Sequence, residues 1–572
     1  MTAAIGRAAY FWTSSFRHSS LLTRILGGVV SLLFGFSQAL GFRMDTRDSL
    51  GLDSAGETVM LLAVGVLASA VFACFLFPLF HFAAEFRGLK ADAYRGLWAL
   101  SAGRRRIVVI GSLLVPWLCY WFLLWPGVTT NDSLNQVSQA LGLVPYSDHH
   151  PIAHTLAIQA VLRPAVALLG NTAVAIGAVT FVQCVVLATL VGCCVDTLRE
   201  FKAPGWTLTL ILAFFAVHPI VGWYSVSLWK DVWLGAFILA FATLTALIVR
   251  RSHAALPIGW NLWGLLILAG LGMMLAKKTG VYVAIPALTL TFFLVARPTR
   301  LRWTAAGAAT LALYFIVHLC LVTGLQAKQG SEVEAWSIPA QQIARSSQEG
   351  ALSAEQSAFF SPYFSGVNPG DVYSPHISDP VKNTLDAAVL QEGRTSFVRE
   401  WLRLGAQNPV VFTEAFLAQT YGYWYPGAKY WVVSSTDWTA IVNTKVPNRP
   451  ELAPLLEEVT SERNHARGLP SAAATTINED LRSIPVLGWM LSLGLWTWAA
   501  VVLACVALLR KQRAAIAVAA VAALVWGTCM VSPVYAEARY AFPLLLLLPL
   551  MCLTAFLPPA PRRVPDIQLN ES

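Results

Sequence analysis

The chain has 572 residues, of which 56% are hydrophobic and only 12% are charged. This composition excludes an ordinary soluble globular protein, because such proteins carry about twice that share of charged residues. The formal net charge is +9. The excess of Lys and Arg gathers near the ends of apolar segments, so it indicates membrane topology and gives no argument for nucleic-acid binding.

Apolar segments long enough to cross a bilayer, which takes roughly 20 residues, recur along the chain. They predict an all-α polytopic membrane protein with about twelve transmembrane helices. The predicted spans lie near residues 21–42, 58–83, 106–125, 172–195, 205–223, 229–250, 259–276, 280–296, 304–325, 485–509, 514–534 and 541–558.

Basic residues cluster in alternate loops, and the positive-inside rule assigns such loops to the cytoplasm. The clusters agree with one another only if residues 151–169, which carry Arg163 and Pro164 in mid-run, lie in the outer interface. A thirteenth span at this position is the alternative, and it would invert several later loops. We therefore expect both termini in the cytoplasm.

This membrane topology divides the chain into three parts. Residues 1–325 form a transmembrane core with a first outer loop at 126–171, and residues 485–572 form the last transmembrane helices and a short tail. Residues 326–484 hold 12 Lys and Arg against 17 Asp and Glu, with many Pro, Gly, Ser and Tyr turns. This region is expected to be an extracytoplasmic, loop-rich domain of mixed structure that covers the core.

The first outer loop carries the polar residues best suited to chemistry. Asp132 begins an amphipathic pattern, where a carboxylate could serve as a general base for an acceptor hydroxyl; a helix cap is the alternative. Asp148, His149 and His150 follow, and they could position an acceptor, attract a cation or fix the loop by hydrogen bonds. Asp132 and Asp148 are the candidate oxygen ligands of Mg²⁺ or Mn²⁺, whereas no Cys or His spacing supports zinc.

Cationic residues also lie at outer span ends. Lys277 and Lys278 oppose the positive-inside trend, so we expect a lipid phosphate or pyrophosphate to compensate them. Lys230 and Asp231 open another span on the same side, and they either join this site or neutralise each other.

The last span begins with a third group of polar residues, Glu537, Arg539 and Tyr540. Arginine can direct two hydrogen bonds onto a phosphate, which lysine cannot. The alternative for Arg539 is an interfacial arginine whose charged end extends to the membrane surface.

Aromatic and amide residues gather in the outer region. Gln341 and Gln342 lie in one motif, and Tyr423 and Trp424 lie in another. Such clusters bind sugars, since ring faces cover C–H groups and amides reach hydroxyls. They also form ordinary interfacial belts in membrane proteins.

The motifs together resemble a family of polytopic bacterial envelope proteins that carries a domain of unknown function. The resemblance extends from about Trp117 to Pro549 and rests on the segments WPGVTTNDSLNQ, DHHPIAHTL, SLWKDVW, KKTGVY, SIPAQQIAR, QTYGYWYP and SPVYAEARYAFPL. The wider architecture looks like the GT-C class of membrane glycosyltransferases. That class implies a catalytic acid in the first outer loop, interfacial helices and a polyprenyl-phosphate sugar donor.

Asp132 matches the first-loop acid of that class by position. Many members show an adjacent acidic pair there, whereas Asp132 stands between Asn131 and Ser133. This departure puts a two-carboxylate metal site in doubt and leaves Asp148 as the candidate partner.

The resemblance implies a glycosyltransferase in the bacterial plasma membrane that acts at its outer face. Asp132 would be the base, while Arg539 with Lys277 or Lys278 would hold the donor phosphate. The partners would be a polyprenyl-phosphate-linked sugar, a glycan or other envelope acceptor, and membrane lipids. The alternatives are a transporter or flippase of a lipid-linked saccharide and an assembly factor without chemistry. Transporters commonly show internal repeats, and none is visible here.

Overall fold

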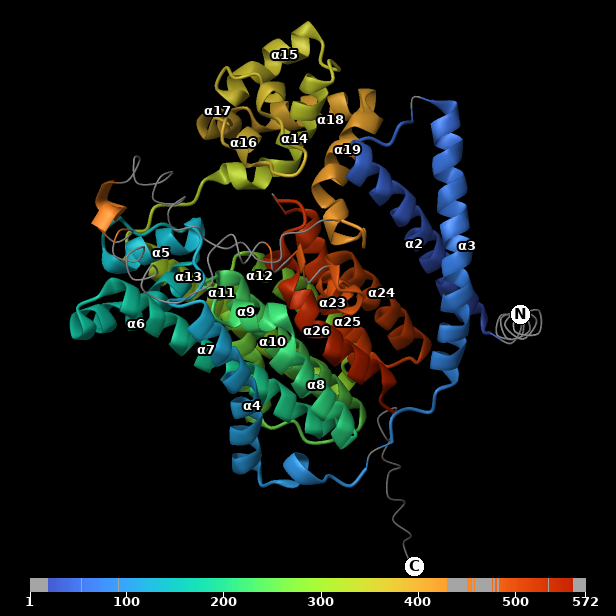
Figure 1. Cartoon of the computed structure of the whole chain (residues 1–572), viewed down its shortest axis with the longest axis vertical. Coiled ribbons are helices and arrows are strands. Elements are labelled where there is room, and N and C mark those ends of the chain that lie inside the picture. Colours follow the sequence, from blue (N-terminus) through green and yellow to red (C-terminus); the bar gives the residue numbers. More distant parts are fainter. Residues whose placement is uncertain are drawn as a thin grey trace, which may run out of the picture.

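The computed structural model describes residues 19–52, 54–90, 92–428, 450–454, 457, 476, 479–480, 483–532 and 534–558. These residues form α-helices and short 3₁₀-helices (Figure 1), and the strand-like contacts among them are isolated bridges. The all-α class expected from the sequence is confirmed for this part of the chain. The predicted short tail, Val564 to Ser572, lies outside the described residues.

Nine helices in the described ranges are long and apolar enough to cross a membrane. They are α2 (Leu21–Arg47), α3 (Ala55–Glu85), α4 (Ala102–Leu123), α6 (Ile152–Leu169), α7 (Thr172–Thr197), α10 (Lys230–His253), α13 (Arg300–Gly324), α25 (Arg513–Met530) and α26 (Ala538–Phe556). The chain is therefore a multi-pass membrane protein.

Two predicted spans are each built from two helices joined at a bend. α8 (Gly205–Val217) meets α9 (Pro219–Ser225) at 58°, and α23 (Pro485–Leu491) meets α24 (Leu493–Leu509) at 73°. Counting each pair as one span gives up to eleven candidates among the described residues, and α11 (Trp260–Ala276) and α12 (Thr279–Leu294) are shorter apolar helices. The predicted number of twelve is not confirmed.

The segment predicted to lie in the outer interface is α6. It packs against α7 and against α5 (Asn131–Leu141) at the edge of the bundle (Figure 1). Its 18 residues meet the length and hydropathy requirements for crossing a membrane. Its interfacial position therefore stays a prediction.

The centre of the bundle is α10, which packs against α7, α11, α25 and α26. Almost every residue from Asp231 to Val249 is buried. Gly235 lies against α26, where an added Cβ atom would come within 2.9 Å of the Phe542 ring. A small residue here allows close approach of two helices, as is usual inside membranes.

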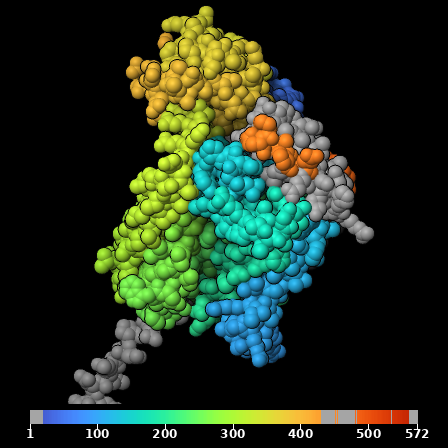
Figure 2. All heavy atoms as spheres, turned by 90° about the vertical axis from the view of Figure 1, so that its left-hand side faces the viewer, coloured from blue at the N-terminus to red at the C-terminus, as the bar shows by residue number. Residues whose placement is uncertain are grey.

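A helical cap stands above one end of the bundle, and α13 leads up to it (Figure 2). Its α-helices are α14 (Ser337–Gln348), α15 (Ala354–Phe360), α16 (Asp379–Lys382), α17 (Ala387–Glu392), α18 (Arg394–Gln407) and α19 (Pro409–Thr420), with 3₁₀-helices η4 (Glu332–Trp336), η5 (Ser361–Phe364), η6 (Pro369–Val372) and η7 (Tyr421–Tyr423). The cap has its own apolar core around Phe360, Phe364 and Phe397. Its described residues contain no strand, so the mixed structure predicted for this region is not confirmed.

Arg345 of α14 ties the cap to the hairpin of α2 and α3. Its guanidinium is almost fully buried and forms ion pairs with Asp48 at 3.2 Å, Glu349 at 2.8 Å and Glu414 at 3.0 Å. Asp48 ends α2, whereas the two glutamates belong to the cap. Charge-assisted hydrogen bonds of this kind fix the cap relative to the bundle.

Candidate functional site

A polar cavity of about 1010 Å³ lies between the cap and the bundle. Its floor comes from the starts of α5, α10, α12 and α26, and its roof comes from η4, α14, α16 and α18 of the cap. The predicted site residues that line it are Asp132, His149, His150, Lys230, Lys277, Lys278, Arg539 and Tyr540.

Backbone contacts bring the first outer loop to the start of α10. Val128 N donates to Val226 O at 3.0 Å, and Leu228 N donates to Val128 O at 2.8 Å. The Ser133 hydroxyl adds a hydrogen bond to Leu228 O at 2.7 Å. These contacts place the start of α5 directly beside the start of α10.

Asp132 lies in the first turn of α5, but its carboxylate does not act as the helix cap. Thr130 occupies the N-cap position, and its backbone N–H donates to the Ser133 hydroxyl at 3.1 Å. Asp132 Oδ2 instead lies 3.2 Å from Lys230 Nζ and 3.2 Å from Arg539 Nη1. The capping alternative is therefore wrong for this side chain.

The two cations decide the protonation of Asp132. Burial by itself would raise the pKa of this carboxyl, but Lys230 and Arg539 outweigh that effect and hold the pKa far below its usual range. The Asp132 side chain keeps 35% exposure toward the cavity. It is ionised at neutral pH and is a weak base while both cations remain in place.

Lys230 also contacts His150. Lys230 Nζ donates to His150 Nδ1 at 2.8 Å, which leaves Nε2 as the protonated ring nitrogen of a neutral imidazole. Burial and the Lys230 charge lower the pKa of His150 to about 3. His149 stacks edge-on against His150, with ring centroids 4.6 Å apart, and also lines the cavity.

The two adjacent lysines have separate protein partners. Lys277 forms an ion pair with Asp231, and Lys278 Nζ lies 2.7 Å from Asp148 Oδ2. Burial lowers the pKa of Lys277, and the Asp231 charge opposes this effect. Each lysine therefore has a protein counter-charge, and a phosphate ligand at this position stays a prediction. Lys230 and Asp231 do not pair with each other, because Lys230 contacts Asp132 and Asp231 contacts Lys277.

Arg539 closes the floor of the cavity. Its Nε lies 3.5 Å from Glu537, and its guanidinium lies 5.5 Å from the centre of the Trp229 ring and 5.0 Å from that of Tyr540. Lys277 Nζ lies 4.0 Å from the centre of the same Tyr540 ring. Aromatic faces stabilise cations in this geometry.

The charges of the floor are arranged in two layers. Lys230, Lys277, Lys278 and Arg539 line the cavity, together with one carboxylate, that of Asp132. The carboxylates of Asp148, Asp231 and Glu537 do not line the cavity and lie behind these cations. Because the positive groups of the floor are nearer to the cavity, an anionic group placed at the floor would meet cations first.

The proposed metal ligands do not meet. Asp132 contacts Lys230 and Arg539, while Asp148 contacts Lys278 and lies 3.9 Å from His318. Within the described ranges, no group of three His, Cys, Asp or Glu side chains could hold a metal ion. The residues therefore do not fit a Mg²⁺ or Mn²⁺ site shared by the two aspartates.

The predicted sugar-binding residues lie away from the polar cavity. Gln341 donates to Ser374 O at 2.7 Å, and Gln342 contacts Phe412 O at 3.1 Å within the cap. Tyr423 is buried, and its hydroxyl donates to Val534 O at 2.9 Å and accepts from Glu537 N at 3.2 Å. These three side chains hold structure together and do not line the site.

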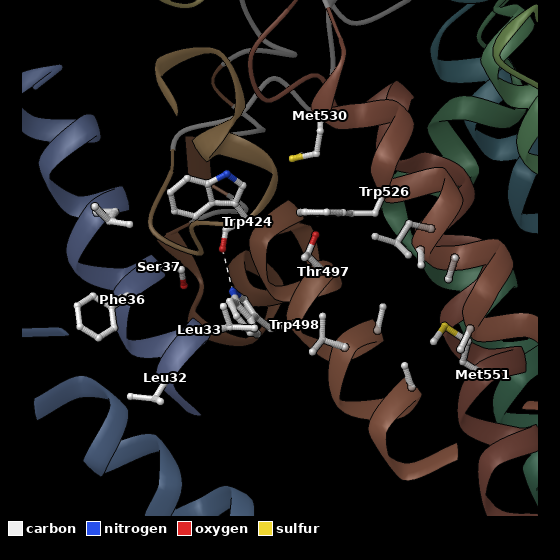
Figure 3. A pocket seen from close by; sticks show the side chains of 18 of the residues that line it. Leu32, Leu33, Phe36, Ser37, Trp424, Thr497, Trp498, Trp526, Met530 and Met551 are labelled. Carbon is white, nitrogen blue, oxygen red and sulfur yellow. Dashed lines mark hydrogen bonds between the residues drawn. The ribbon is translucent and has the colours of Figure 1, made fainter. Parts of the chain in front are cut away.

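Trp424 lines a different cavity, which lies between α2 and the helices α24, α25 and α26 (Figure 3). This cavity has a volume of about 920 Å³ and an almost wholly apolar lining. The Trp424 carbonyl accepts a hydrogen bond from Trp498 Nε1 at 2.9 Å. Trp424 therefore lines a mostly apolar cavity, in which Ser37 and Thr497 are the hydroxyl-bearing side chains of the lining.

Several cap residues in the roof of the polar cavity were not predicted. They include Glu332, Glu334, Asp379, Lys382 and Trp401. Lys382 Nζ lies 2.8 Å from Glu334 and 2.7 Å from Asp379. No local sequence signal marks these residues, because short cap helices bring them together.

Comparison with curated proteins and with solved structures gave no match. A family of unknown function, DUF6020, matches residues 143–563. The match includes Lys230, Lys277, Lys278 and Arg539, and it begins after Asp132. Because it covers most of the sequence, the chain belongs to this family of unknown function.

Proposed function

We propose that this chain is a membrane-embedded, GT-C-like glycosyltransferase of the bacterial plasma membrane. It transfers a sugar from a polyprenyl-phosphate donor to a glycan, lipid or protein acceptor of the envelope. The cap and the polar cavity face the outside, and the termini face the cytoplasm. This orientation is supported by the positive-inside rule, because the basic clusters Arg104 to Arg106 and Arg250 with Arg251 lie at the other end of α4 and α10.

One observation carries the proposal. Asp132 shares a single cavity with four cations that could bind phosphate, and it touches two of them, Lys230 and Arg539. A transferase that uses a lipid-phosphate donor needs this combination, with cations for the phosphate and a carboxylate for the acceptor proton.

The reaction follows from these roles. The acceptor hydroxyl oxygen attacks the anomeric carbon of the donor sugar, and its proton passes to a carboxylate oxygen of Asp132. The bond between the anomeric carbon and the phosphate oxygen breaks, and the electron pair stays on the phosphate. Arg539 and Lys277 or Lys278 stabilise the charge that develops on this leaving group.

Donor binding would also activate the base. The donor phosphate competes with Asp132 for Lys230 and Arg539, because both cations line the cavity. When these cations turn to the phosphate, the pKa of Asp132 rises toward its normal range, and burial raises it further. The carboxylate then becomes a stronger base only when the donor is present.

The test uses the full chain in proteoliposomes with polyprenyl-phosphate donors that carry a labelled sugar. We expect transfer of label to an envelope glycan or lipid fraction, with release of one polyprenyl phosphate for each sugar transferred. Failure of the protein to consume any such donor, under conditions where it binds polyprenyl phosphate, would refute the transferase.

A flippase is the second candidate, favoured by the two bent helix pairs α8 with α9 and α23 with α24. Broken helices are frequent in transporters. A flippase would move the intact donor across the vesicle membrane without breaking its glycosyl bond. Asp132→Asn would then leave donor movement nearly unchanged, whereas it should lower transfer by the enzyme about 10²–10⁴-fold.

A further inference from the structure

A second polar cavity lies between α4, α7, α10 and α11. Its volume is about 590 Å³. We call it the arginine cavity, after the charged residues in its lining, which are Arg105, Arg106, Asp196, Arg199, Glu200 and Arg251. None of these residues takes part in the proposed transfer reaction.

The two polar cavities lie at opposite ends of the same helix. Lys230, the first residue of α10, lines the cavity under the cap, and Arg251, near its last residue, lines the arginine cavity. A helical separation of 21 residues corresponds to about 31 Å. Because the hydrocarbon core of a bilayer is about 30 Å thick, the arginine cavity lies near the phosphate groups of the other leaflet.

The charges of the arginine cavity are not balanced. Arg105 and Arg106 share Asp196, and Arg251 Nη2 lies 2.7 Å from Glu200 Oε2. The Arg199 guanidinium stacks 4.4 Å from the centre of the Tyr94 ring.

Among the residues that the structure describes, Arg199 has no carboxylate partner, and its buried Nε has no hydrogen-bond acceptor. The lining therefore carries two more positive than negative groups.

One wall of the arginine cavity is apolar and faces the membrane. Leu262 and Leu265 of α11 line the cavity, and Leu265 is 49% exposed on the outside of the bundle. Trp260, at the start of the same helix, is also exposed. A ligand that fits both parts of the cavity needs an anionic group and an apolar chain.

We propose that the arginine cavity binds the phosphodiester headgroup of an anionic phospholipid, with one acyl chain along Leu262 and Leu265. The phosphate would contact Arg106 and Arg199, while the buried pair of Arg105 and Asp196 remains intact. Basic pockets between membrane helices commonly hold such headgroups. This site depends on the membrane orientation of α10 and is independent of the glycosyltransferase proposal.

Native mass spectrometry of the full chain in detergent tests this site. Cardiolipin and phosphatidylglycerol should bind the wild type much more tightly than phosphatidylethanolamine. The double variant Arg106→Gln with Arg199→Gln should weaken cardiolipin binding about thirtyfold at low salt, since two cationic contacts are lost. Arg297→Gln removes an exposed arginine outside the cavity and should bind cardiolipin like the wild type.

The possible results of these binding experiments distinguish a lipid headgroup from a soluble phosphate compound. Equal binding of anionic and zwitterionic lipid, or unchanged cardiolipin binding by the double variant, would overturn the proposal. Displacement of cardiolipin by millimolar inorganic phosphate would assign the cavity to a soluble phosphate compound and would also overturn it. If the double variant does not fold, Arg106→Gln alone is used, because the Arg106 side chain is 59% exposed. This single variant should still weaken cardiolipin binding severalfold. Unchanged binding would overturn the proposal.

Discussion

Arg539 Nη1 lies 3.2 Å from Asp132 Oδ2, although 407 positions separate the two residues along the chain. The same carboxylate oxygen lies 3.2 Å from Lys230 Nζ. One carboxylate therefore joins the starts of α5, α10 and α26. Loss of the Asp132 carboxylate would remove the proposed base and would also free both cations for a phosphate. Its effects on transfer and on binding should therefore differ in direction.

Asp132→Asn should lower the rate of sugar transfer about 10²–10⁴-fold, because an amide cannot take up the proton of the attacking hydroxyl. Binding of polyprenyl phosphate should stay equal or become tighter, since Lys230 and Arg539 lose their protein counter-charge. Single-turnover transfer and equilibrium binding, both with labelled lipid, measure these two quantities separately.

Asp148→Asn is the comparison variant for that experiment. The Asp148 carboxylate pairs with Lys278 and does not line the cavity, so its transfer rate should stay within about tenfold of the wild type. Wild-type transfer by Asp132→Asn, or an equal loss in both variants, would remove Asp132 from the role of base.

Arg539→Gln should weaken the binding of polyprenyl phosphate by roughly 10–100-fold, the usual cost of a lost charge-assisted hydrogen bond. Arg539→Lys should recover only part of the affinity, because lysine keeps the charge but cannot direct two parallel hydrogen bonds. Arg403→Gln, an exposed position in the cap, is the control and should bind like the wild type. Equal affinities of all three variants would exclude Arg539 from the phosphate site.

The convergence of polar side chains from distant span ends on one cavity could be predicted for a physical reason. Ionisable groups at span ends are costly unless they meet water or partners, so their positions alone indicated one shared site. The structure brings Asp132, Lys230, Lys277 and Arg539 to the same cavity. The individual ion pairs could not be predicted, because they depend on the rotation of α10 and α26 about their axes.

The cap was predicted less well. Its α-helices are short, from 4 to 14 residues, so hydrophobic periodicity had little length in which to appear. Tyr423 and Gln342 have the composition of a sugar site, but their partners are backbone carbonyls of the protein itself. Composition gives the kind of contact a side chain can make and does not identify its partner.

Tyr423→Phe tests whether the cap positions Arg539. The Tyr423 hydroxyl contacts Val534 O and Glu537 N, in the loop that leads into α26. Loss of these bonds should lower the unfolding free energy by about 1–2 kcal/mol and also weaken phosphate binding at Arg539.

Tyr363→Phe is the matched control, because it removes one hydrogen bond, to Gly393 O at 3.2 Å, inside the cap. It should lower stability to a similar extent and leave phosphate binding unchanged. If both variants weaken binding equally, the loss reflects general instability of the cap and not the position of Arg539.

Topology is tested by single cysteines placed in a cysteine-free background, since five of the nine native cysteines are exposed. Glu355→Cys, on the exposed surface of α15, should react with an impermeant maleimide added to intact cells. Arg104→Cys, exposed at the start of α4, should react only after the membrane is opened. Labelling of Arg104→Cys in intact cells would invert the proposed orientation of the cap.

The pH dependence of stability should reveal the buried His150. Burial and Lys230 lower the pKa of this residue to about 3, whereas an unfolded histidine titrates near 6.5. Its contribution to stability is therefore complete above about pH 6.5 and is lost as the pH falls toward 3, by at most about 2 kcal/mol between pH 7 and pH 5.

Scanning fluorimetry should show a larger drop in Tm between pH 7 and pH 5 for the wild type than for His150→Gln. His149→Gln, at an exposed position, should keep the wild-type slope. Parallel curves for the wild type and His150→Gln would mean that His150 is not held neutral in the native protein.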